Sequence, residues 1–383
     1  MHDAPPDWHL LTGEYPPQPG GVGDYTRLVA EALARTGASV HVWATGPEGV
    51  TDEAGVTVHR APRLFTSGLP GLTRALDACR APRRLLLQYV PHAFGMKAMN
   101  LPFCAWFASR RHDERWVLFH EVVYPFESGA PLRRHVLAGV THAMARWVAS
   151  TADRVFVSIP SWAAPLPGDA RRRAEWRPVP SNLPTQAPED RVREARAALG
   201  TGPVLGHFGT YGPSITGLLE PLLVRILSGD TRRLAVLLGR GSLAYRAALA
   251  ERHPELADQL RALDALAPAD AAVHLKACDV LLQPYPDGVS SRRGSAMAGL
   301  GLGMPLVTNT GHLTEPLWRE LRPVEFTEGH DPIAMATATE RLLRHPDKRH
   351  ALATRAAEVY QAHFALERTL EALFASTTKR PVR

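Results

Sequence analysis

Two adjacent arginines, Arg292 and Arg293, stand in an otherwise small and apolar stretch, PYPDGVSSRRGSAMAGLGLGMPLV at 284–307. A strand is predicted just before them, and a helix is predicted to begin near Ser291. Cations at a helix start oppose the positive end of the helix dipole, so a plain surface role is unfavourable. Planar guanidinium groups beside free backbone N–H groups predict a phosphate or diphosphate site instead. Asp287 is expected to accept hydrogen bonds from sugar hydroxyls of the same ligand.

A glycine-rich loop, PPQPGGVGDY at 16–25, is the second candidate site. It follows a predicted strand and opens a predicted helix, with Gly20, Gly21 and Gly23 at the turn. Glycines at such a turn let the backbone approach a ligand closely, and the helix start favours an anion or a polar oxygen. The spacing is neither GxGxxG nor a Walker A loop. A simple tight turn remains the alternative.

Histidines near strand ends form the third group. The stretch FHEVV at 119–123 places His120 and Glu121 at the carboxyl end of a predicted strand. A histidine facing a ligand there can donate a hydrogen bond or transfer a proton. A histidine satisfied within the core is the alternative. His92, in QYVPHAFG, is a weaker candidate of the same kind.

The elements that would position these residues alternate between short apolar strands and amphipathic helices, which is typical of parallel α/β layers. Helices are expected at 25–37, where Gly37 would end the helix, and at 132–150. Strands are predicted at 8–15, 39–46, 84–90, 116–123, 154–160, 203–211, 233–241, 279–285 and 305–311.

The chain of 383 residues is long for a single core and favours two domains. Prolines crowd residues 162–190 with little periodicity, which predicts an interdomain linker there. We therefore expect a doubly wound α/β domain over 1–185, a second over 186–360, and a terminal helix at 361–383. Ligands are expected in a cleft between the two domains, at the carboxyl ends of the strands.

The composition narrows the class of protein. With 45% hydrophobic and 21% charged residues, the chain is expected to be globular. No apolar run reaches the length of a membrane span, and the N-terminus does not resemble a signal peptide. The three cysteines are widely spaced, which suggests neither disulfides nor a metal site. A reducing, cytoplasmic location is the resulting expectation.

The net charge of +6 and the pI near 9.5 raise the question of an anionic partner. The basic residues are interspersed with acidic ones, which argues against nucleic-acid binding. A phosphate-bearing substrate or an acidic membrane surface fits the charge equally well. The stretch LPFCAWFASRR at 101–111 would suit an interfacial membrane helix, although a buried helix of the first domain is the more common outcome.

Together these motifs resemble the GT-B glycosyltransferases, specifically the retaining family usually numbered four. EYPPQPGGVGDYTRLVAEALARTG is similar to that family's acceptor-side glycine-rich loop and first helix, and FHE to its donor-contacting histidine position. PYPDGVSSRRGSAMAGLGLGMPLVTNTG resembles its donor motif, in which two glutamates are separated by seven residues. FALERTLEALF at 364–374 resembles the closing helix that crosses back to the first domain.

The resemblance implies two Rossmann-like domains and sugar transfer from a nucleotide-diphosphate sugar to an acceptor hydroxyl, with retention of configuration. It implies no metal and no cofactor, while the acceptor and the oligomeric state stay open. His120 and Asp287 would be catalytic, and Gly20, Tyr89 and His92 would lie on the acceptor side. Donor binding would fall to Gly21, Val22, Gly209, Thr210, Arg240, Gly288, Val289, Ser290, Arg292, Arg293 and Ser295.

The sequence departs from the family pattern at the donor site. Asp287 and Ser295 occupy the two glutamate positions, and a serine would hold ribose hydroxyls only weakly. Thr210 and Thr216 stand where the family commonly carries a diphosphate-binding Arg and Lys. The paired arginines of the donor motif, with Arg240, are the expected replacements.

Three other readings stay open. The lost charges suit a catalytically silent or repurposed relative of the same fold. A nucleotide-sugar epimerase shares the architecture but fits the glycine-rich loop and the closing helix less well. A binding module for nucleic acid or a membrane surface would bind in a strongly salt-dependent way and ignore nucleotide sugars.

Overall fold

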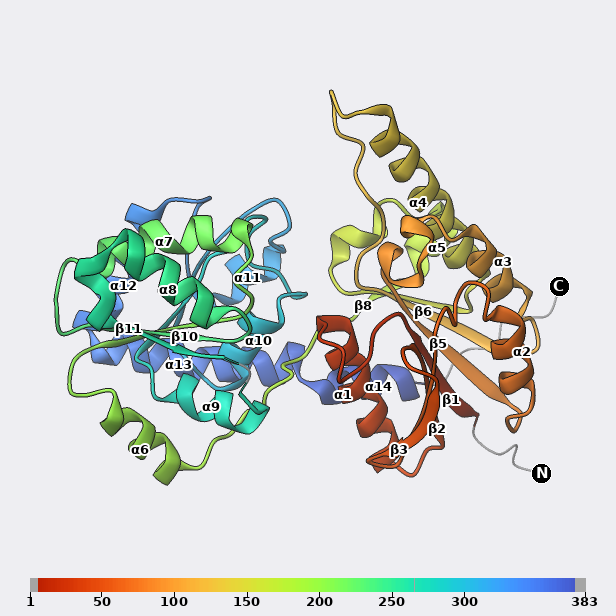
Figure 1. Ribbon diagram of the computed structural model, residues 1–383, viewed down its shortest axis with the longest axis horizontal. Coiled ribbons are helices and arrows are strands. Elements are labelled where there is room, and N and C mark those ends of the chain that lie inside the picture. The colour runs from red at the N-terminus through yellow and green to blue at the C-terminus, as the bar shows by residue number, and fades with distance from the viewer. Residues whose placement is uncertain (1–5, 265, 376–383) are drawn as a thin grey trace. The chain divides into compact units, whose positions relative to one another are not determined.

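The computed structural model describes residues 6–264 and 266–375 (Figure 1). The chain divides into two compact units. The first contains the chain up to Pro178 together with the segment from Thr369, and the second is Val179–Arg368. Each is an α/β unit built on its own sheet.

The sheet of the first unit has the strand order β3-β4-β2-β1-β5-β6-β7-β8. All neighbours pair in parallel except the antiparallel β3 and β4. The strands are β1 (Asp7–Thr12), β2 (Val40–Thr45), β3 (Gly49–Glu53), β4 (Val56–Ala61), β5 (Arg83–Tyr89), β6 (Glu114–Phe119), β7 (Arg154–Val157) and β8 (Ala174–Trp176). The α-helices are α1 (Gly21–Arg35), α2 (Leu69–Asp77), α3 (Leu101–Ser109), α4 (Leu132–Thr151) and α5 (Gly168–Arg173).

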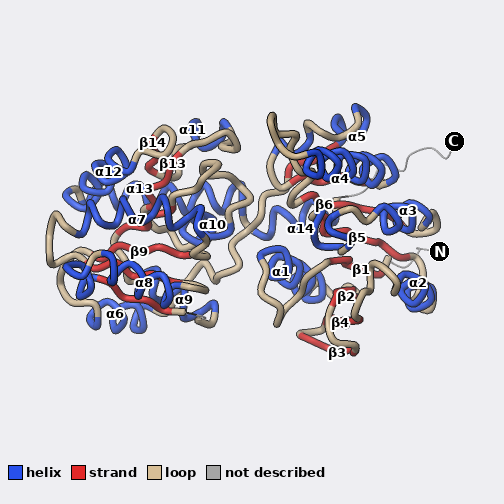
Figure 2. Tube along the Cα trace, turned by 45° about the horizontal axis from the view of Figure 1, so that its top comes forward, coloured by secondary structure: helices blue, strands red, loops and turns tan. Residues whose placement is uncertain are grey.

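The sheet of the second unit has the order β11-β10-β9-β12-β13-β14, and all its pairs are parallel. Helices lie on both faces of this sheet (Figure 2). The strands are β9 (Val204–Phe208), β10 (Leu234–Leu238), β11 (Leu260–Leu263), β12 (Val280–Gln283), β13 (Leu306–Asn309) and β14 (Glu325–Thr327). The α-helices are α6 (Glu189–Ala198), α7 (Pro213–Leu227), α8 (Ser242–Arg252), α9 (Pro268–Lys276), α10 (Gly294–Gly301), α11 (Pro316–Leu321), α12 (Pro332–Arg344) and α13 (Pro346–Val359). A further helix, α14 (Leu366–Phe374), begins in the second unit and belongs to the first from Thr369 onward.

Each sheet has a point at which the order of its strands reverses direction. In the first unit this point lies between β1 and β5, and in the second between β9 and β12. The connections after two such strands leave in opposite directions, which opens a crevice at their carboxyl ends. Ligand sites of doubly wound sheets are expected there.

All nine predicted strands are confirmed, but five others were not predicted: β3, β4, β8, β11 and β14. The predicted linker over 162–190 was wrong in its first part. Residues 168–176 form α5 and then β8, which pairs in parallel with β7 in the first unit's sheet. The prolines of this segment lie before and after these short elements. A strand of three residues is too short to show a periodic pattern in the sequence.

The interfacial reading of residues 101–111 is not supported. Helix α3 buries Phe103 and Phe107 completely in the core of the first unit. Trp106 is half-buried, and its indole Nε1 donates to Thr73 Oγ1 over 2.8 Å. The aromatic side chains of this helix are therefore occupied by packing.

The end of the described chain packs within the first unit. Residues of α14 from Thr369 onward belong to it, and Arg154 donates from Nη1 to the carbonyl of Ala372 over 2.8 Å. The rings of Phe374 and Trp8 meet edge to face with centroids 6.2 Å apart. None of the described helices combines the length and the apolar character needed to cross a membrane.

Candidate functional site

Three loops converge at the strand reversal of the second unit. Gly239 follows β10, and a Cβ on it would lie 2.3 Å from the carbonyl oxygen of Gly209, which follows β9. A Cβ on Gly209 would in turn lie 3.9 Å from Oγ of Ser295, in α10 after β12. Gly209 and Gly239 have φ of 155° and 106°, which favour glycine. These glycines let the loops meet in backbone contact.

An ion-pair cluster occupies the loop between β12 and α10. Asp287 accepts from Nη2 of Arg292 through one carboxylate oxygen and from Nη2 of Arg293 through the other. The guanidinium of Arg293 also lies over the ring of Tyr285, 4.8 Å from its centroid. Burial would raise the pKa of Asp287, but Arg293 and Arg292 outweigh it and hold that pKa below its usual range. Asp287 is thus a carboxylate fixed between two cations.

The cluster keeps one positive charge in excess. The side chains of Arg292 and Arg293 are 20% and 21% exposed, so solvent and ligands still reach them. Arg240, in the loop after β10, is exposed and makes no hydrogen bond or ion pair with the described residues. The prediction that α10 begins near Ser291 was wrong, since it begins at Gly294 and the two arginines precede it.

The backbone N–H groups of Gly288 and Val289, which were expected to bind the donor, donate to carbonyl groups of the protein instead. The N–H of Gly288 donates to the carbonyl of Tyr285 over 3.1 Å, and that of Val289 to Asn309 over 2.9 Å. The side chain of Val289 is fully buried. These two amides are therefore used inside the loop and are not free for a diphosphate. Gly288 serves the turn, because its φ is 84° and a Cβ there would lie 2.1 Å from the N atom of Gly311.

A buried carboxylate that the sequence analysis missed anchors the same loop. Glu315 accepts from the N–H of Ser291 over 3.0 Å, from the Ser291 hydroxyl, and from Trp318 Nε1 over 2.8 Å. Burial raises the pKa of Glu315, and these hydrogen bonds offset part of that effect. Its place directly before Pro316, at the start of α11, was the available signal. Glu315 is a positioning residue for the loop that carries the arginines.

We expect Glu315→Ala to lower the free energy of unfolding of the second unit by about 2–4 kcal/mol, because three buried donors lose their acceptor. Glu315→Gln keeps an acceptor oxygen and should cost less. Urea unfolding of both variants measures the difference. Glu328→Ala, which removes an exposed carboxylate paired with Arg319, is the control and should change stability little. Equal effects of Glu315→Ala and Glu328→Ala would contradict the anchoring role.

The remaining predicted residues of this unit lie around the three loops. Thr210 is exposed directly after Gly209. Ser290 is fully buried, and its hydroxyl has no hydrogen-bond partner in the part of the chain that the structure describes. Ser295 Oγ lies 2.8 Å from the Tyr285 hydroxyl. His207, which the sequence analysis also missed, donates from Nδ1 to the carbonyl of Leu282 over 2.7 Å. Its Nε2 is buried, finds no partner within residues 6–264 and 266–375, and lies 3.9 Å from a Cβ built on Gly209.

In the first unit, the glycine-rich loop is closed by its own chain. Glu14 accepts from the N–H groups of Val22 and Gly23 over 2.9 and 3.1 Å through one oxygen. A Cβ on Gly20 would lie 2.1 Å from this carboxylate, so the glycine makes room for it. Gly21 is exposed at the first position of α1. The predicted anion at this helix start is thus Glu14, which the sequence analysis did not single out.

His120 lies beside the same helix start. It is 6% exposed, its Nε2 is 2.8 Å from Oε1 of Gln88, and its ring meets that of Tyr25 edge to face at 4.9 Å. Burial lowers the pKa of His120 to about 3, so the ring is neutral near pH 7. A neutral imidazole can offer one N–H and one lone pair, but not a positive charge.

The two other residues predicted on the acceptor side differ in exposure. Tyr89 is completely buried among Phe94, Phe119 and other core residues, and its hydroxyl has no hydrogen-bond partner among the described residues. Burial raises the pKa of this hydroxyl well above its usual range. Its placement on the acceptor side was wrong, because the last residue of β5 points into the core. His92 is exposed, with Nδ1 3.9 Å from a carboxylate oxygen of Glu121.

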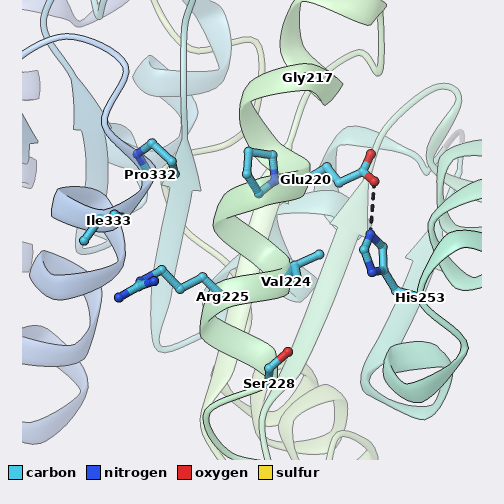
Figure 3. Close-up of a pocket in the computed structure, with 9 residues that line it drawn as sticks. Gly217, Glu220, Val224, Arg225, Ser228, His253, Pro332 and Ile333 are labelled. Carbon is cyan, nitrogen blue, oxygen red and sulfur yellow. Dashed lines mark hydrogen bonds and ion pairs between the residues drawn. The ribbon is translucent and has the colours of Figure 1, made fainter.

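A surface cavity of about 660 Å³ lies elsewhere in the second unit, along α7 and α12 (Figure 3). Pro221, Val224 and Ile333 give it an apolar floor. At the edge of the cavity, the Glu220 carboxylate accepts a hydrogen bond from His253 Nε2 over 3.2 Å. None of the predicted site residues lines this cavity.

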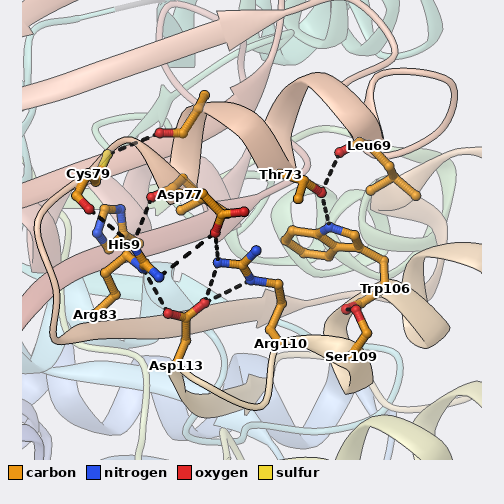
Figure 4. A network of polar contacts seen from close by, with 12 residues as sticks. His9, Leu69, Thr73, Asp77, Cys79, Arg83, Trp106, Ser109, Arg110 and Asp113 are labelled. Atoms are coloured by element: carbon orange, nitrogen blue, oxygen red, sulfur yellow. Dashed lines mark hydrogen bonds and ion pairs between the residues drawn. The ribbon is translucent and has the colours of Figure 1, made fainter.

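One group of described residues has the residue types of a metal site: His9, His41 and Cys79, with potential ligand atoms within 4.8 Å of one another. Trp43 Nε1 donates to His9 Nδ1 over 3.1 Å, which leaves the proton of the neutral ring on Nε2 and no lone pair for an ion. Burial lowers the pKa of His9 to about 3. Figure 4 shows His9 and Cys79 beside an ion-pair network of Asp77, Arg83, Arg110 and Asp113.

Comparison with known proteins relates both the sequence and the fold to glycosyltransferases. Residues 20–182 match the model of the glycosyl transferase 4-like domain. None of the curated proteins matches the sequence. Sucrose-phosphate synthase from Thermosynechococcus elongatus is similar in structure, with a TM-score of 0.72 and 18% identity over 97% of this chain and 100% of that one.

Two further structures are similar over almost the same extent. HepE from Anabaena, solved with UDP and glucose, has a TM-score of 0.66 and 15% identity over 97% of this chain and 100% of that one. WaaG, a glycosyltransferase involved in lipopolysaccharide biosynthesis, has a TM-score of 0.67 and 14% identity over 96% of this chain and 100% of that one. The chain thus has the fold of the GT-B glycosyltransferases, and its residues 20–182 correspond to their glycosyl transferase 4-like domain.

Proposed function

We propose that this protein transfers a sugar from a nucleotide-diphosphate sugar to an acceptor hydroxyl, with retention of configuration and without a metal ion or other cofactor. The cluster of Asp287, Arg292 and Arg293 at the strand reversal of the second unit carries the proposal. It places fixed cations at the carboxyl ends of the strands, where doubly wound sheets bind nucleotides.

Cations at this position would stabilise the transition state of sugar transfer. When the glycosidic bond to the diphosphate breaks, negative charge grows on the leaving phosphate, and fixed positive charge stabilises that change. Arg292 and Arg293 supply it at the expected place, with Arg240 on the neighbouring loop. Thr210 and Thr216 carry no charge at the positions where the family commonly has an Arg and a Lys.

UDP-glucose is the first donor to test, because HepE was solved with it and the Escherichia coli trehalose-6-phosphate structure with UDP-2-fluoro glucose. His120 would accept a hydrogen bond from a hydroxyl of the donor sugar at Nδ1, because the single N–H of its neutral ring already donates from Nε2 to Oε1 of Gln88. The acceptor would approach the start of α1 at the exposed Gly21, since the Glu14 carboxylate fills the space beside Gly20. We expect the enzyme to act in the cytoplasm, where sugar nucleotides are available.

A catalytically silent relative is the second candidate. It is favoured by Ser295 at the second glutamate position and by Asp287, which already neutralises part of the positive charge at the site. A silent relative would bind no sugar nucleotide, or would bind one without releasing the nucleoside diphosphate.

A panel of UDP-, GDP-, ADP- and dTDP-sugars tests the proposal. We expect one of them to raise the melting temperature of the purified chain, and slow release of the matching nucleoside diphosphate to persist in EDTA. Binding without any release, with acceptor sugars present, would favour the silent relative. Stabilisation by none of the four would refute the proposal, and loss of turnover in EDTA would refute its metal-free part.

A further inference from the structure

Helix α4 of the first unit exposes an apolar stripe. Leu132 is 78% exposed, Val136 51% and Trp147 40%. At 100° per residue these three positions fall within about 60° of the helix circumference. Gly139 and Ala143, which are also exposed, lie on the same side. The stripe runs for about 22 Å along the helix, at 1.5 Å per residue.

Phe126 widens this stripe at its beginning. It is 59% exposed and comes from the segment that leads into α4. Its ring stacks on His135, with centroids 6.1 Å apart, and lies 5.0 Å from that of His142. Figure 1 shows this segment and the first turns of α4 reaching away from the sheet of their unit. We call Phe126, Leu132, Val136 and Trp147 the α4 patch.

The charged side chains of helix α4 itself are all basic. Helix α4 contains three arginines and two histidines but no Asp or Glu. Arg133 and Arg146 are exposed on opposite sides of the stripe, and neither makes a hydrogen bond or ion pair with the described residues. Arg134 differs, because it points to the far side of the helix and donates to Glu127 over 3.0 Å.

We propose that the α4 patch binds an acidic lipid membrane surface, with the helix lying in the plane of the interface. An amphipathic helix with aromatic and aliphatic side chains on one side and arginines at its borders has the chemistry that anionic interfaces select. A second copy of the chain fits poorly. A symmetric contact through α4 would place Arg133 and Arg146 opposite cations of the same helix, which is repulsive.

Vesicle binding by the full chain tests the proposal. We expect the protein to sediment with vesicles of equal parts phosphatidylglycerol and phosphatidylcholine, and far less with phosphatidylcholine alone. Salt should weaken the binding. The double variant Leu132→Ser/Val136→Ser should lose most of it, and Arg133→Gln/Arg146→Gln should weaken it by about fivefold for each arginine.

Matched controls remove the same chemistry elsewhere. Leu243→Ser changes an exposed leucine of α8 in the second unit, and Arg193→Gln/Arg344→Gln removes two exposed arginines there. Both should bind vesicles as the unmodified chain does, and all variants should keep its melting temperature. Since the test uses no sugar nucleotide, its outcome is separate from that of the proposed function.

Three results would overturn the proposal. One is the absence of binding to acidic vesicles. Another is binding that salt removes but Leu132→Ser/Val136→Ser leaves unchanged, which would show charge attraction without insertion of the patch. The third is a concentration-dependent dimer, seen by light scattering, that this variant abolishes while vesicle binding stays the same. That result would assign the patch to self-association.

Discussion

Replacing both arginines, as Arg292→Ala/Arg293→Ala, should weaken binding of UDP by about a hundredfold or more if the proposed donor site is right. Each arginine is expected to make a charge-assisted hydrogen bond to the diphosphate, worth about 1.5–3 kcal/mol. Removing both also leaves Asp287 unpaired, so its negative charge would repel the ligand. Isothermal titration of UDP into each protein measures the loss.

Asp287→Asn is the informative counterpart. In the free protein Asp287 holds both guanidinium groups, and its pKa lies below the usual range, so it is charged at neutral pH. An incoming diphosphate must compete with it. Asp287→Asn should therefore strengthen the binding of inorganic diphosphate. A UDP-sugar, in contrast, would lose the carboxylate that accepts hydrogen bonds from its sugar hydroxyls. Weaker diphosphate binding by Asp287→Asn would contradict this competition.

A control for charge loss uses two exposed arginines of the second unit, as Arg193→Ala/Arg344→Ala. This variant should bind UDP as the unmodified chain does. Unchanged affinity in Arg292→Ala/Arg293→Ala, with a melting temperature that shows it folded, would remove these residues from the proposed site. The fold and the comparisons would then stand, but the missing Arg and Lys would have no replacement in this loop.

Lowering the pH from 7.5 to 5.5 should destabilise the protein by on the order of 3 kcal/mol through three buried histidines. Burial lowers the pKa of His9 and His120 to about 3 and that of His207 to about 4. Between those values and about 6.5, the unfolded chain binds protons that the folded chain does not. Stability therefore rises with pH across this window and levels off above it.

Calorimetry at several pH values measures this effect as a fall in melting temperature of about 6–10 °C. Two of the histidines, His9 and His120, lie in the first unit and one in the second, so the first unit should lose more. His207→Gln should reduce the pH dependence of the second unit, with exposed His350→Gln as the control for loss of a histidine. A melting temperature that does not change between pH 7.5 and 5.5 would contradict the prediction. Glu315, whose pKa is raised, acts in the opposite direction and makes the observed loss smaller.

The sequence by itself determined the α/β class, nine of the fourteen strands that the structure describes and the position of the arginine-bearing loop. Apolar strands buried on both faces read as continuous runs, and glycine and proline mark the turns after them. Strands such as β8 and β14, of three residues each, leave no period to read. They exist because a neighbouring strand offers them a ladder of hydrogen bonds.

Only the tertiary structure decided which polar groups are free. Sequence spacing placed Asp287 near Arg292 and Arg293, but only the fold shows the carboxylate bonded to both. Glu14 closes the helix start that was expected to bind a ligand, and Glu315 reaches the arginine loop from 24 residues further along the chain. Such pairings depend on where loops after different strands meet. A single sequence carries the residue types of a site, whereas packing decides which of their hydrogen bonds the chain satisfies itself and which it leaves for a ligand.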